Sequence, residues 1–192
     1  MVIVLYLVLL FCAWRIYVVY ISGLSNSVKN NIAIHATVVI ASIFCALWVL
    51  DQWQFSHWKK GIPTEIEISK NIDVGAEYGL LGGCGFAVFE LSTNMLNKIN
   101  TNGINALSVA RDSQYFNYSE WQKTPYLDAK EGSESQDFWQ MGMYCGSPSM
   151  SSELQNKIQT ALNNPDSYYA LDGPTGLIVI PKLKLTVIST WK

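Results

Sequence analysis

Histidine is nearly absent from this chain of 192 residues, which contains only His35 and His57. Enzymes that activate a serine or cysteine nucleophile usually need an imidazole base, and zinc sites usually need several His and Cys ligands. His35 lies inside a long apolar run, and His57 lies among the aromatic residues that follow it. The sequence therefore argues against a Ser/His/Asp or Cys/His catalytic site and against a zinc site. We expect no metal and no cofactor.

Acidic residues are absent from the first 50 positions, where the basic or titrating groups are Arg15, Lys29 and His35. All 15 acidic residues fall within residues 51–192, together with 11 of the 13 basic residues. No basic patch with interleaved aromatic residues occurs, so the electrostatic signature of a nucleic-acid-binding protein is missing. The uneven distribution predicts two separable parts and no nucleic-acid partner.

The N-terminal part contains two long apolar runs, at residues 1–23 and 32–50. A helix of about 20 residues spans the roughly 30 Å hydrocarbon core of a bilayer, and both runs have that length. Neither run has the polar face of an amphipathic helix, so a buried helical hairpin in a soluble protein is the less favoured alternative. The first run also lacks the positive n-region and the cleavage site of a signal peptide. We predict a two-span transmembrane hairpin over residues 1–52, with the lipid bilayer as a partner.

The positive-inside rule does not decide the membrane orientation. Lys29 lies between the two runs, whereas Lys59 and Lys60 follow the second run, so the two sides carry similar positive charge. The remainder of the chain contains two cysteines, Cys84 and Cys145, and an even count permits one disulfide in an oxidising compartment. We therefore expect a bacterial inner-membrane protein whose C-terminal domain is extracytoplasmic, in the periplasm. The alternative is the reverse orientation, with a cytoplasmic domain and two free thiols.

A glycine-rich stretch, GLLGGCGFAVFEL at residues 79–91, surrounds Cys84 with four glycines. A Walker loop needs Gly-Lys-Ser/Thr and a dinucleotide fingerprint needs a following helix, whereas Phe86 and other strand-forming residues follow here. An activated thiol needs a base or a positive charge nearby, but the neighbouring titrating groups are Glu77 and Glu90. The stretch is expected to be a turn that enters a strand, with Cys84 bridged to Cys145.

After an aromatic connector at residues 53–61, residues 62–192 have the pattern of an α+β domain. Alternation of apolar and polar residues predicts strands, a Gly/Pro turn predicts a hairpin, and serines at capping positions predict helix starts. We expect a small antiparallel or mixed sheet with one or two helices packed on one face. Strands are predicted at residues 62–72, 86–91, 168–171, 177–180 and 182–190, and helices at residues 93–99 and 151–164.

Between residues 112 and 146 the periodicity fails, and eight aromatic residues are scattered among polar ones. So long an irregular segment is uncommon in a compact domain and is often functional. Tyr and Trp dominate binding hot spots, so we expect this segment to bind a protein partner or a cell-envelope component. The alternative is that these aromatic residues build the core. The residues singled out for binding are Trp121, Tyr126, Trp139 and Tyr144.

These features favour a non-catalytic accessory or inhibitor-type interaction protein in the membrane. The competing hypothesis is a small envelope hydrolase that uses paired carboxylates on a glycan-type substrate, since two carboxylates are enough for glycoside hydrolysis. No spacing in the sequence identifies such a pair, so no catalytic residue is assigned. The carboxylates that could serve are Glu77, Glu90, Asp112, Glu120 and Asp137.

Overall fold

The computed structural model describes residues 11, 14–15, 28–78, 83–125, 142 and 150–191. The chain divides into two compact units, Met1–Trp53 and Gln54–Lys192. The second apolar run forms the helix α2, Val28–Lys59. The first apolar run is described only at residues 11, 14 and 15, so the predicted two-helix hairpin lies largely outside the described residues.

In the first unit, α2 exposes its apolar side chains. Among the described residues one helical segment, His35–Lys59, is long and apolar enough to cross a membrane, and none of its most apolar window is buried. Phe44 is 69% exposed and Trp48 is 63% exposed. The 25 residues of this segment correspond to a helix about 37 Å long, which exceeds a hydrocarbon core of roughly 30 Å. The core helix of a soluble protein would bury such side chains, although a signal sequence has the same length and composition.

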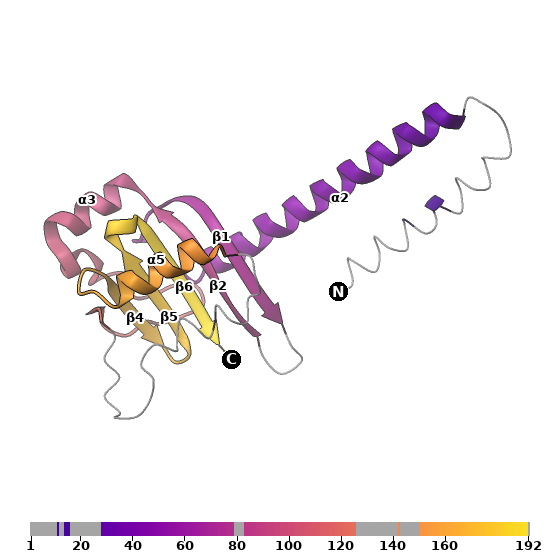
Figure 1. The fold of residues 1–192 in the computed structure, drawn as a ribbon. Helices are drawn as coiled ribbons and strands as arrows, with labels where there is room; N and C mark the ends of the chain where they lie inside the picture. The colour runs from indigo at the N-terminus through magenta and orange to yellow at the C-terminus, as the bar shows by residue number, and fades with distance from the viewer. Residues whose placement is uncertain are drawn as a thin grey trace. The chain divides into compact units, whose positions relative to one another are not determined.

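The second unit is an α+β domain built on a six-stranded sheet (Figure 1). Every pair of neighbouring strands is antiparallel, in the order β1-β2-β6-β5-β4-β3. The glycine-rich stretch is therefore part of a strand from its fifth residue onward, and this strand pairs on both sides. The strands are β1 (Ile68–Tyr78), β2 (Gly83–Leu91), β3 (Gln122–Lys123), β4 (Tyr168–Asp172), β5 (Thr175–Ile180) and β6 (Leu185–Trp191).

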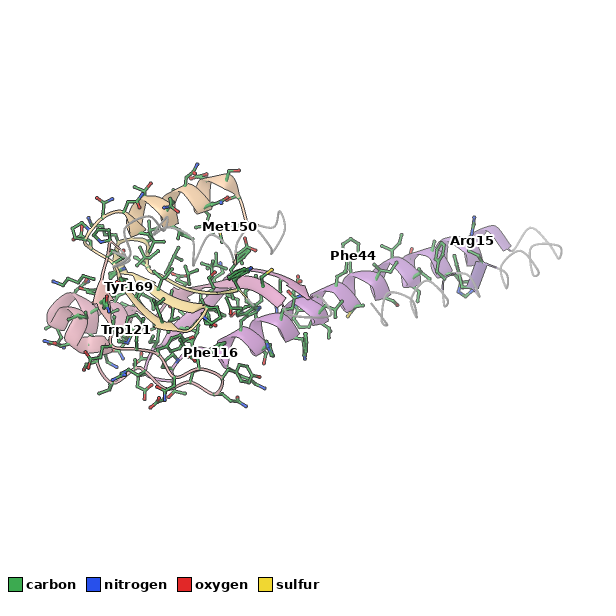
Figure 2. The ribbon with its side chains drawn as sticks, turned by 90° about the horizontal axis from the view of Figure 1, so that it is seen from below. Arg15, Phe44, Phe116, Trp121, Met150 and Tyr169 are labelled. Atoms are coloured by element: carbon green, nitrogen blue, oxygen red, sulfur yellow. The ribbon has the colours of Figure 1, made fainter. Side chains whose placement is uncertain are left out.

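Helices cover the sheet on both faces. In β2, Ala87 and Phe89 belong to the core cluster that contains the residues of α3 (Thr93–Asn102), whereas Phe86 and Val88 belong to the cluster of α5 (Ser152–Leu162). We call these two sides the α3 face and the α5 face. Figure 2 shows Phe116 and Trp121 on one side of the sheet and Met150 on the other.

The expectation that the helices share one face was wrong. All six residues of β5 are buried, as are the first five residues of β6. A strand that is apolar at consecutive positions must be covered on both faces, as in buried sheets generally. The alternating strand Lys182–Thr190 of the prediction instead starts with a short 3₁₀ turn, η2 (Pro181–Leu183), before β6 begins.

The serine caps predicted at the starts of both helices are confirmed, and of the neighbours Ser151 and Ser152 it is Ser151 that caps α5. Ser92 Oγ accepts a hydrogen bond from the Met95 N–H at 3.0 Å, and Ser151 Oγ accepts one from the Leu154 N–H at 3.2 Å. A 3₁₀ helix, η1 (Gly103–Leu107), follows α3. The predicted hairpin around the Gly/Pro turn is also confirmed, because β4 and β5 pair with each other across it.

The first predicted strand was misplaced. Residues 62–67 are not extended; Ile62 and Ile66 are buried in the core of the α3 face, and the Ile66 N–H donates to Pro63 O at 3.0 Å in a turn. Glu67 holds this turn against α3, because its carboxylate accepts hydrogen bonds from Ser92 Oγ and Lys98 Nζ. The strand β1 therefore starts at Ile68, and the alternation of Ile66 and Ile68 reflects burial rather than a common strand.

Candidate functional site

A cavity of about 280 Å³ lies in the second unit, among residues at the ends of four separate segments. An apolar cavity of about 150 Å³ is enough to hold a benzene molecule, so this one has room for a group of about ten heavy atoms. We call it the aromatic pocket. The described residues that line it are His57, Trp58, Gly61, Gly83, Cys84, Tyr115, Phe116 and Thr190.

Gly61 allows the walls of the pocket to approach each other closely. A Cβ atom at this position would lie 2.7 Å from Ile188 Cδ1 and 2.9 Å from Phe116 Cε2, which is closer than real carbon contacts. The carbonyl oxygen of Gly61 accepts a hydrogen bond of 2.7 Å from the buried hydroxyl of Tyr118. The end of α2 is thereby fixed to the loop that carries the aromatic wall.

That loop is held in place by hydrogen bonds within itself and to two neighbouring segments. Ser113 Oγ accepts the Phe116 N–H at 2.9 Å, and the Ser113 N–H donates to Phe116 O at 2.9 Å. The Gln114 N–H donates to Lys60 O at 3.0 Å, next to Gly61. Asn117 N–H donates to a carboxylate oxygen of Asp172 at the end of β4. The aromatic wall is therefore formed before any ligand binds, which lowers the entropy cost of binding.

One polar group in the pocket wall is unsatisfied. Trp58 is 6% exposed, and its Nε1 is buried with no hydrogen-bond partner. Leaving a buried N–H unpaired costs about 1–3 kcal/mol. The contrast with Trp121 is direct, because Trp121 Nε1 donates to Ala110 O at 2.9 Å. Trp58 thus has a buried donor that the described part of the protein leaves unpaired.

The pocket has few other polar side chains. None of the described lining residues is an Asp, Glu, Lys or Arg. The hydroxyl groups of Thr190 and Thr175 form a hydrogen bond of 2.7 Å with each other. The rings of His57 and Tyr115 lie 5.1 Å apart, and Tyr115 is 41% exposed, so this pair stands where the pocket meets solvent. Such a lining favours an apolar group over an ionic one.

The carboxylates of the competing hydrolase hypothesis do not gather at this pocket. Glu90 is half-buried, Asp112 and Glu120 are exposed, and none of these three lines it. Asp137 and the side chain of Glu77 lie outside the described residues. In the described part of the chain no three His, Cys, Asp or Glu residues are placed to hold a metal ion.

Of the residues singled out for binding, the structure describes only Trp121. It is 7% exposed and belongs to the core of the α3 face, with its indole N–H paired inside the protein. This is the position expected under the alternative that the aromatic residues build the core. The other three, Tyr126, Trp139 and Tyr144, lie outside the described residues, and so does Cys145.

The sequence did not identify the residues that form the pocket as a set. In the sequence, His57 is one of two histidines and lies among aromatic residues after the second apolar run, whereas Gly83 and Cys84 belong to the glycine-rich stretch. No local pattern unites the lining residues, because the sheet brings together the starts and ends of elements that are far apart in sequence. The one available signal was the pair Tyr115–Phe116 inside a polar segment.

Comparison with known proteins adds no relative: no family model, no curated protein and no solved structure matches this chain. The fold and the pocket define its class by themselves. It is an α+β domain on a six-stranded antiparallel sheet, preceded by an apolar helix and containing an apolar, aromatic pocket.

Proposed function

We propose that this chain is a small integral membrane protein whose α+β domain is a non-catalytic binding module. In this proposal the apolar runs form a two-span hairpin in a bacterial inner membrane, and the domain lies on the extracytoplasmic side. There it acts as an accessory or inhibitor-type interaction protein that binds a protein partner or an envelope component through the aromatic pocket.

The aromatic pocket is the observation that carries the proposal. Its walls are preformed, its lining has no charged residue among those described, and Trp58 contributes an unsatisfied N–H. Pockets of this kind, apolar with few polar groups, are typical of ligand-binding sites.

Exposure of α2 supports the membrane part of the proposal. The side chains of Phe44, Trp48 and Val49 are each more than half exposed. Contiguous apolar surface of this extent is rare on soluble monomers, and a bilayer would cover it.

The position of Gly142 supports the predicted disulfide and, with it, an oxidising compartment. A Cβ atom on Gly142 would meet Ser189 Oγ, and it would lie 2.7 Å from Gly85 O, so this residue packs against β6 and β2. Ser189 pairs with Phe86, and alternation along β2 puts the Cys84 side chain on the same face as Phe86. Three residues of chain span at most about 11 Å. In this proposal the bridge from Cys145 to Cys84 forms within that limit.

The test is photo-cross-linking in intact cells, with p-benzoylphenylalanine in place of Tyr115 at the pocket. The matched control carries the same photoreactive residue in place of Val109, which is 72% exposed and does not line the pocket. We expect an adduct of defined mass at position 115 and none at 109, in protein that resists carbonate extraction from membranes. Equal adducts at both positions would refute pocket binding, and release by carbonate would refute membrane insertion.

The side of the membrane on which the second unit lies is tested by adding protease to spheroplasts. We expect cleavage of the second unit without lysis of the cells. Cleavage only after lysis would refute the extracytoplasmic placement.

A further inference from the structure

We draw no further inference here: the strongest candidate, the outer edge of β1, is irregular at two positions and has its Val74 N–H donated to the Asp73 carboxylate, and nothing in the described part of the chain shows what covers it.

Discussion

Tyr118 is the residue whose removal should most directly loosen the pocket from the end of α2. Its side chain is fully buried, and its hydroxyl donates to the carbonyl of Gly61 at 2.7 Å. The substitution Tyr118→Phe keeps the ring and its packing, so it creates almost no cavity. It removes the donor to a buried carbonyl, which costs about 1–3 kcal/mol when the acceptor is left unsatisfied. We expect the free energy of unfolding to fall by about 2 kcal/mol at neutral pH.

This difference should depend on pH. Burial raises the pKa of Tyr118 well above its ordinary value of 10.0, and the negative charge of Asp172 raises it further. The folded protein keeps the hydroxyl proton at a pH where the unfolded chain releases it, so stability decreases as pH rises above about 10. The loss is about 1.4 kcal/mol for each pH unit. The Phe variant lacks this group, so the advantage of the wild type should shrink to about 0.6 kcal/mol at pH 11.

The assay is urea unfolding of the full chain in non-ionic detergent micelles, followed by near-UV circular dichroism at neutral pH and at pH 11. Tyr115→Phe is the matched control, because Tyr115 is 41% exposed and should change stability by less than about 0.5 kcal/mol. A loss below about 0.5 kcal/mol for Tyr118→Phe would show that the Gly61 carbonyl finds another donor. A difference that stays constant or grows between the two pH values would refute the assignment of a buried, protonated hydroxyl.

Three further predictions concern the second unit. Hydrogen bonds from Lys98, Asn94 and Ser92 lower the pKa of Glu67 from 4.5 to about 2. The contribution of Glu67 to stability is therefore present above pH 4.5 and is lost as pH falls toward 2. Glu67→Gln should make the melting temperature less dependent on pH in this acidic range, and an unchanged pH dependence would contradict this. Ser151→Ala should lower the free energy of unfolding by about 1 kcal/mol, because it removes the cap of α5. Ser152→Ala should leave it nearly unchanged in the same urea titration, and equal effects of the two variants would contradict the capping assignment. For Cys84 and Cys145 we expect thiol labelling in intact cells only after reduction, and ready labelling without reductant by a membrane-permeant reagent alone would contradict both the bridge and the outward domain.

Sequence patterns predicted those elements whose signals are local. The caps at Ser92 and Ser151 depend on a side chain and an N–H three residues apart, so the sequence contains both partners. The β4–β5 hairpin depends on a turn between two strand-forming runs, which is also local. The apolar character of α2 is a matter of composition over one stretch.

The errors came from contacts between segments that are distant in sequence. Ile66 and Ile68 alternate like strand residues, yet Ile66 is buried in a turn because Glu67 is held by α3, 25 and more residues later. The position of Trp121 also depends on a distant contact, because its indole N–H donates to the Ala110 carbonyl inside the core.

The sequence by itself determined that the chain has an apolar N-terminal part and an α+β remainder, and that it contains only two histidines. Periodicity, capping and composition are properties of neighbouring residues, so they can be recognised without a structure. Only the tertiary structure decided which aromatic residues are core and which surround a cavity. The aromatic pocket exists because antiparallel pairing brings the start of β2 beside the end of β6, next to the end of α2 and the loop of Tyr115 and Phe116. That proximity depends on the register of the sheet. The residues that line the pocket form no sequence pattern from which this register could be read.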